Sequence, residues 1–273
     1  MRAVLLGTGA PPPNPGRRGP STLLALGGER FLVDAGAGAG VQLVQAGLRP
    51  YEWPRVLITH HHSDHTIDLG HLLISRWIAG QNAPFGVWGP AGTRRQMDKL
   101  LDYLDWDIAV RRRHMHDRPA PHVHVTEIEE GKIIEAGGVT VSAFLVDHDP
   151  VKPAFGFRFE GGGRSVVVSG DTRPSDNLVR WSRGVDCLIH ECCEMAHTSW
   201  SPGCGWATRE EKVRDLASYH TQPDAIGEVA AAAAPRKLVL YHLMPGSVPA
   251  ELEAAVRTKF AGPVTIGEDL QEV

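Results

Sequence analysis

The densest group of potential metal ligands in the chain is the run His60-His61-His62-Ser63-Asp64-His65. It follows Val56–Ile58, a short apolar stretch typical of a buried strand. His60 and His62 are two residues apart, so in an extended backbone their side chains project to the same side. Imidazole nitrogens together with a carboxylate suit Zn²⁺, and also Mn²⁺ or Fe²⁺. The run therefore predicts a metal site, and its position after a buried strand disfavours an ordinary His-rich surface loop.

Other apolar runs along the chain also end in residues that can bind metals. These endings are Asp147-His148, Asp171, His190-Glu191 and His242. Each alone has a simple structural explanation, such as an Asp that caps a turn or a His that is satisfied in the core. Together they indicate that several strands bring polar side chains to one shared rim.

The elements that would position these residues are short apolar runs bounded by Gly, Pro or Asp, which predict strands. Clear examples are Ala3–Leu6, Thr22–Leu26, Phe31–Val33, Val56–Thr59, Val139–Val146, Ala154–Phe159, Ser165–Ser169, Cys187–Ile189, Lys237–Tyr241 and Val264–Ile266. Helical patterns lie between some of them, over Val41–Ala46, Leu69–Ile78, Thr93–Asp105, Pro223–Ala234 and Ala250–Lys259. This order predicts an α/β protein with two sheets packed face to face and helices outside, a four-layer αββα sandwich.

The 273 residues are expected to form a single domain, 1–273, because no Gly/Ser or Pro tract acts as a linker. Two stretches, at about 105–124 and 192–214, are interpreted as insertions that form walls or lids of the pocket, with ordinary surface loops as the alternative. In the second stretch, Trp200 and Trp206 are expected either to stack on an apolar leaving group or to pack in the core.

The overall charge gives no reason to expect binding to nucleic acid, since the formal net charge is −4 and the pI is about 6.4. The basic run from Arg111 through His114 to Arg118 is interpreted as a solvated surface loop. No stretch has the length of a membrane span or the pattern of a secretory signal, so a cytoplasmic location and no membrane partner are expected. The four cysteines are expected to be reduced thiols, with a small metal site from Cys192, Cys193 and Cys204 as an alternative.

Eight segments that span most of the chain carry a resemblance to a known family. They are GTGAPPPNPGRRGPSTLL, FLVDAGAG, THHHSDH, VDHDPVKPAFGFRF, SGDT, LIHE, YHTQPDAIGEVAAAA and LVLYHL. With them, the sequence resembles the metallo-β-lactamase-fold superfamily, in its ribonuclease Z and arylsulfatase-like branch of metal-dependent hydrolases. The resemblance implies the metallo-β-lactamase fold and two divalent metal ions, with Zn²⁺ expected first and Mn²⁺ or Fe²⁺ as alternatives.

The resemblance also implies a role for individual residues. The implied metal ligands are His60, His62 and His148 for one ion, Asp64, His65 and His242 for the other, and Asp171 as the bridge between them. His61 is left as a spacer. Asp34 is implied to order the ligand loop, and His220 to lie near the leaving group of the substrate, where Glu191 would orient it.

The chemistry expected of two close metal ions is hydrolysis by a metal-bridging hydroxide. Asp64 or Asp171 would orient the hydroxide, and His220 would supply a hydrogen bond or a proton. In the zinc β-lactamases of the superfamily a cysteine often occupies the position of Asp171, so the aspartate favours the ester and phosphodiester hydrolases. The first motif also lacks the glutamate typical of the di-iron redox members, which argues against an oxidoreductase.

The substrate is expected to be a small-molecule ester, with a phosphodiester or an aryl sulfate ester favoured. Ribonuclease Z enzymes that process tRNA carry a long arm, usually between the equivalents of His148 and Asp171, and here that interval is 171 − 148 = 23 residues. The short interval and the acidic pI argue against nucleic acid as a partner. A ribonuclease Z-type tRNA 3′-processing endonuclease is the alternative, and a lactone, carboxylic ester or amide hydrolase is a second one.

Two further expectations concern assembly and activity. Many members of the branch are dimers, so the resemblance allows a homodimer, although no sequence pattern marks an interface. A non-catalytic binding protein on the same scaffold is disfavoured because no implied metal ligand is missing.

Overall fold

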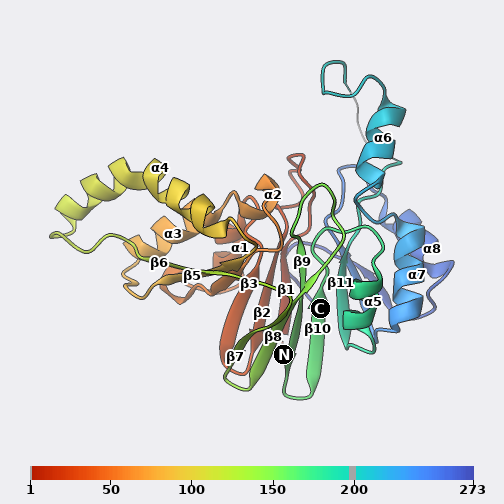
Figure 1. Cartoon of the computed structure of the whole chain (residues 1–273), viewed down its shortest axis with the longest axis horizontal. Helices are drawn as coiled ribbons and strands as arrows, with labels where there is room; N and C mark the ends of the chain where they lie inside the picture. Colours follow the sequence, from red (N-terminus) through yellow and green to blue (C-terminus); the bar gives the residue numbers. More distant parts are fainter. Residues whose placement is uncertain (1, 197–200) are drawn as a thin grey trace.

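The computed structural model describes residues 2–196 and 201–273, which form two seven-stranded sheets packed face to face (Figure 1). The first sheet contains β1 (Arg2–Gly7), β2 (Ser21–Leu26), β3 (Glu29–Val33), β4 (Arg55–Leu57), β5 (Phe85–Gly89), β6 (Val123–Glu127) and β14 (Gln271–Glu272). The second contains β7 (Gly131–Ala136), β8 (Val139–Leu145), β9 (Phe155–Gly161), β10 (Arg164–Val168), β11 (Cys187–Glu191), β12 (Leu238–Tyr241) and β13 (Val264–Ile266). Strands β3 to β6 pair in parallel in one sheet, and β10 to β13 in the other.

Helices lie on the outer side of each sheet. Beside the first sheet are α1 (Ala39–Gln45), α2 (Ser63–Thr66), α3 (Leu69–Ile78) and α4 (Thr93–His114), with a short 3₁₀ helix at Pro50–Glu52. Beside the second are α5 (Asp176–Ser182), α7 (Pro223–Ala233) and α8 (Pro249–Arg257), while α6 (Arg209–Ala217) projects from one end (Figure 1). The layers are those of an αββα sandwich, so the predicted fold class is confirmed. Across the described part of the chain, none of the helices combines the length and the apolarity needed to cross a lipid bilayer.

Alternate residues of the central strands face two different cores. In β10, Val166 and Val168 lie between the two sheets, whereas Val167 faces the core that includes Leu178 of α5 and Ile226 of α7. Each buried side chain of this size contributes about 1.5–3 kcal/mol to the free energy of unfolding. Because both faces are buried, the strands are apolar throughout, which explains the continuous apolar runs in the sequence.

The longest helix extends beyond its predicted range. α4 continues 114 − 105 = 9 residues past the predicted end at Asp105, and Ile108 adds a further buried apolar position. Its last turn carries Arg111–Arg113, whose positive charges favour the carboxyl end of a helix. The interpretation of the basic run as a loop is therefore wrong for Arg111 to His114, whereas the part from Met115 to Arg118 lies outside the helix. The first proline after the helix is Pro119, so nothing in the covalent structure stops the helix at Asp105.

Candidate active site

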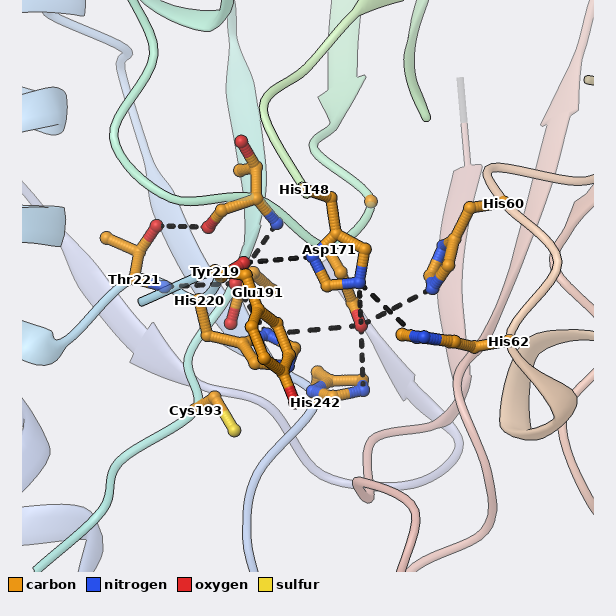
Figure 2. A network of polar contacts seen from close by, with 12 residues as sticks. His60, His62, His148, Asp171, Glu191, Cys193, Tyr219, His220, Thr221 and His242 are labelled. Atoms are coloured by element: carbon orange, nitrogen blue, oxygen red, sulfur yellow. Dashed lines mark hydrogen bonds and ion pairs between the residues drawn. The ribbon is translucent and has the colours of Figure 1, made fainter. Parts of the chain in front are cut away.

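The predicted metal ligands lie in loops that follow the ends of strands from both sheets (Figure 2). The run from His60 to His65 follows β4 in the first sheet and includes the short helix α2. In the second sheet, His148 comes after β8, Asp171 after β10 and His242 directly after β12. The carboxyl ends of neighbouring parallel strands meet at one edge of a sheet, so these loops converge on one region.

The structure brings all seven predicted ligands together in two groups. The groups are His60, His62, His148 and Asp171, and Asp64, His65 and His242, and the ligand atoms within each lie within 4.8 Å of one another. Asp171 Oδ2 lies 3.7 Å from His60 Nε2 and 3.3 Å from His65 Nε2, so this carboxylate lies between the groups. The arrangement matches the division that the resemblance implies, and metal binding by these residues stays a prediction.

Several buried polar atoms at this centre have no hydrogen-bond partner among the described residues. They include His60 Nε2, His65 Nε2 and Asp171 Oδ1. Buried polar atoms are nearly always paired, and coordination to a metal would pair all three of these atoms. Burial holds the pKa of His60 well below its ordinary value, which favours the neutral ring that a metal requires. Nitrogen and carboxylate donors in this arrangement fit divalent metal ions.

Contacts behind the ligands fix which ring nitrogen faces the centre. His65 Nδ1–H donates to Asp34 Oδ2 at 2.8 Å, and the Thr59 hydroxyl also contacts this carboxylate at 2.9 Å. His148 Nδ1–H donates to the backbone carbonyl of Tyr219 at 2.9 Å. In each case Nε2 keeps its lone pair for a metal, because a carboxylate or a carbonyl oxygen only accepts. The contacts of Thr59 and Tyr219 were not predicted, since they come from tertiary packing and not from the identity of the residue.

Unusual backbone conformations occur at the same centre. Asp34 and His242 have φ values of 61° and 59°, in the left-handed region that non-glycine residues rarely adopt. Gly170 also has a positive φ, of 64°, and a Cβ atom there would lie 2.6 Å from the backbone oxygen of Phe155. Such strain is typical of functional sites, where the surrounding structure holds the residue in place.

The Asp34 carboxylate is expected to support metal binding without contacting the metal. In Asp34→Asn, one carboxylate oxygen is replaced by an NH₂ group that cannot accept a hydrogen bond. His65 and Thr59 then compete for the one remaining oxygen, so His65 loses its fixed orientation. Metal affinity should fall about 10–100-fold, the usual effect of losing such a contact. Competition with a chromogenic chelator measures this, and the exposed Asp176→Asn is the matched control. Equal affinity in the Asp34 variant and the wild type would contradict the role.

His220 lies beside the two groups and is held by Glu191 (Figure 2). Its Nδ1–H donates to Glu191 Oε1 at 3.0 Å and lies 4.0 Å from Asp171 Oδ2. Glu191 Oε1 also accepts from the backbone N–H groups of Thr172 and Thr221. Burial disfavours the charged ring, but the attraction and hydrogen bond of Glu191 outweigh it and raise the pKa of His220 to about 9. Glu191 therefore favours the protonated form of His220, which is the form that can donate a proton.

A cavity of about 220 Å³ lies beside His62, Asp171 and His220. Its other lining residues are Pro11, Pro12, Cys193, Trp206, Lys212, Leu216, Tyr219 and Met244. The stretch 192–214 thus supplies Cys193, Trp206 and Lys212, whereas no residue of 105–124 lines this cavity. Trp200 lies outside the described residues. Lys212 was not predicted, because only its position on α6 brings it to the cavity.

The remaining candidate residues are not members of the two groups, although Cys193 Sγ lies within 4.8 Å of ring nitrogens of His220 and His242. His61 Nε2 contacts Thr93 Oγ1 at 2.9 Å, at the start of α4, in agreement with its role as a spacer. The four cysteines are free thiols, as expected. Among the described residues, Cys204 does not join Cys192 and Cys193 in a group of potential metal ligands.

Comparisons with known proteins identify the family. Residues 29–243 match the family model of the beta-lactamase superfamily domain. A protein named Ribonuclease Z from Mycobacterium sp. (strain KMS) is 37% identical over 279 residues, which cover 100% of this chain and 95% of that protein. The chain belongs to the ribonuclease Z branch of the metallo-β-lactamase superfamily.

Solved structures share the fold of this metallo-β-lactamase-superfamily chain. The metallo-beta-lactamase fold protein YhfI from Bacillus subtilis has a TM-score of 0.78 at 20% identity, with 100% of this chain and 98% of that one covered. The short form of human tRNase Z has a TM-score of 0.72 at 24% identity, with the same coverage. As a member of the ribonuclease Z branch, the chain is a metal-dependent hydrolase that acts on ester bonds.

The expectations about the substrate of this ribonuclease Z-branch member are wrong. A small-molecule ester was favoured and nucleic acid was disfavoured, yet the relative that matches from end to end is named Ribonuclease Z. The alignment exceeds this chain by only 279 − 273 = 6 residues, so that relative has no room for a long arm either. The short interval between His148 and Asp171 therefore does not separate the chain from its relatives. The pI is an average over the whole chain and does not describe one local surface.

Proposed function

We propose that the chain is a ribonuclease Z-type endonuclease that removes the 3′ trailer from precursor tRNA. The observation that carries the proposal is the assembly of all seven predicted ligands beside His220, in a chain matched from end to end by a protein named Ribonuclease Z. Two divalent ions are part of the proposal, with Zn²⁺ expected first because imidazole and carboxylate donors suit it. A cytoplasmic location is also part of it.

The residues of the site have complementary roles in this proposal. When bound, two divalent ions would polarise the phosphodiester and make hydroxide available near neutral pH. Asp64 would accept a hydrogen bond from the attacking hydroxide and orient it toward phosphorus. As the new P–O bond forms and the P–O bond to the leaving oxygen breaks, His220 would donate its proton to that oxygen. Glu191 would hold His220 in place and keep it protonated.

The direct test uses a precursor tRNA with a 3′ trailer, incubated with the protein and either Zn²⁺ or Mn²⁺. The expected result is a single cut at the boundary between the tRNA and the trailer, mapped by sequencing gels. The same RNA with its acceptor stem unpaired is the control that tests whether the protein recognises the folded tRNA. Hydrolysis of bis(p-nitrophenyl) phosphate without any cut in the precursor would overturn the proposal and point to a small diester instead.

The pairing of Glu191 with His220 predicts a change in the pH profile. The acid must be protonated, so the rate should fall as the pH rises through the pKa of His220. Glu191→Gln removes the negative charge that raises this pKa. The pH at which the rate falls should therefore be lower by about 1 unit or more in this variant. The value of kcat/KM on precursor tRNA measured against pH tests this, with metal content measured in parallel. If kcat/KM of Glu191→Gln falls at the same alkaline pH as that of the wild type, Glu191 acts only through packing.

A further inference from the structure

The cavity beside His220 has the size of a site for one ring system. Its volume of about 220 Å³ is below the roughly 300–1,000 Å³ of pockets for drug-sized ligands. Its lining joins the predicted metal ligands His62 and Asp171 and the proposed proton donor His220 to the apolar residues Leu216 and Met244. A group attached to the reacting phosphate can therefore enter the cavity directly.

Two aromatic side chains line the cavity and are held in place. The Tyr219 ring lies 4.9 Å from the His220 ring, measured between centroids, so it borders the proposed proton donor. The indole N–H of Trp206 donates to Asp215 Oδ2 at 2.8 Å, and Lys212 Nζ lies 5.5 Å from the centroid of the Trp206 ring. Aromatic rings that combine with a nearby cation are typical of sites that stack nucleic-acid bases and attract the attached phosphate.

The position of His220 indicates which part of the substrate enters. A proton donor must lie within hydrogen-bond reach of the leaving oxygen, so the group on that oxygen lies on the side of His220. The cavity that His220 lines also includes Tyr219, Trp206 and Lys212 in its wall. A separate cavity is lined by Ser63, Asp64 and Arg18, and it shares Pro11 and Pro12 with the cavity beside His220.

We propose that the cavity lined by Trp206, Lys212 and Tyr219 is a base-binding subsite for the nucleoside that carries the leaving oxygen. Trp206 stacks on the base, and the Lys212 ammonium group attracts the neighbouring phosphate. The subsite rests on the proposed endonuclease function, and it explains how a chain without a long arm aligns the scissile bond. Trp206 is thus a specificity-determining residue.

The first test compares two diesters that both release p-nitrophenolate, namely bis(p-nitrophenyl) phosphate and methyl p-nitrophenyl phosphate. In Trp206→Leu, kcat/KM should fall by a similar factor of about 5- to 100-fold on both, as expected for the loss of one stacking contact. Trp206→Phe should recover most of the activity, because it keeps an aromatic face. Trp106→Leu, on the exposed outer surface of α4, is the matched control and should leave both rates unchanged.

The two diesters separate the possible outcomes. If kcat/KM of Trp206→Leu falls on bis(p-nitrophenyl) phosphate alone, the p-nitrophenyl group that does not leave occupies the cavity. That result would overturn the assignment of the cavity to the leaving group. Unchanged rates on both diesters, with wild-type metal content, would overturn the subsite itself. A fall in Trp206→Leu that Trp206→Phe does not recover would also overturn it, since the loss would then come from a displaced α6.

The second test uses precursor RNA with an abasic residue on one side of the scissile phosphate at a time. The products show which fragment keeps the phosphate, and so which nucleoside carried the leaving oxygen. Removal of that base should lower wild-type kcat/KM about 5- to 100-fold and should have little further effect in Trp206→Leu. Additive losses would overturn the subsite. Failure of the wild type to cut any precursor would overturn the proposed function, whereas normal cutting by both Trp206→Leu and wild type would overturn the subsite alone.

Discussion

Replacing Asp171 with alanine should abolish hydrolysis and lower the metal content of the protein. The Asp171 carboxylate lies within 4.0 Å of ring nitrogens from both groups of predicted ligands, so its loss removes the one residue that the two proposed metal ions share. Activity on precursor tRNA should fall about 1,000-fold or more, which corresponds to a loss of about 4 kcal/mol of transition-state stabilisation. Elemental analysis should find fewer than two metal ions per chain.

Two further variants complete this experiment. Asp64→Ala removes a predicted ligand of one ion only, so it should also abolish activity while part of the metal remains bound. Asp176→Ala changes an exposed aspartate in the first turn of α5 and should alter neither metal content nor rate. Retained activity in Asp171→Ala would show that the bridging role is assigned to the wrong residue.

Replacing His220 with alanine should slow the cleavage of RNA far more than the cleavage of an activated ester. A ribose oxygen is a poor leaving group and needs a proton, whereas p-nitrophenolate leaves without one. The rate on precursor tRNA should therefore fall about 10²–10⁴-fold, the usual contribution of general acid catalysis. The rate on bis(p-nitrophenyl) phosphate should fall by less than about tenfold, and kcat for each substrate measures the difference.

The comparison of the two substrates separates proton donation from a structural role. His220 also packs against His148 and His242, with ring centroids 5.0 Å and 5.5 Å away, so its removal could disturb the metal ligands. A structural disturbance would lower both rates together and reduce the metal content. Equal losses on the two substrates would therefore contradict the assignment of His220 as the acid.

The fold was predictable from the sequence because its strands are buried on both faces. Val166, Val167 and Val168 face two different cores, so every position in β10 is apolar and the strand is visible as a continuous run. Helix α3 was predicted with its observed bounds, since its apolar spacing is regular. The end of α4 was not predictable, because Asp105 and the arginines that follow it are as compatible with a polar helix as with a loop.

The candidate ligands could be predicted only where they lie close together in the sequence or follow directly after an apolar strand. His60, His62, Asp64 and His65 form one motif in the sequence, whereas their division between two metal ions is implied by the resemblance to the family. Contacts such as Tyr219 with His148 depend on how distant segments pack, and no local pattern encodes them. The substrate was predicted wrongly because the short interval between His148 and Asp171 indicates only that a long arm is missing there. It does not exclude RNA binding by another surface.

The proposed ligands follow strands of both sheets, so bound metal ions would also have a mechanical role. An ion held by His60, after β4 of one sheet, and by His148, after β8 of the other, would act as a cross-link between the two halves of the sandwich. By thermodynamic reciprocity, whatever loosens the contact between the halves must also weaken the affinity for the ions. A substitution in the core between the sheets, at Phe157 for example, would then weaken metal binding although it lies outside the ligand loops. Metal affinity and the cohesion of the two halves would in this way be two measures of one equilibrium.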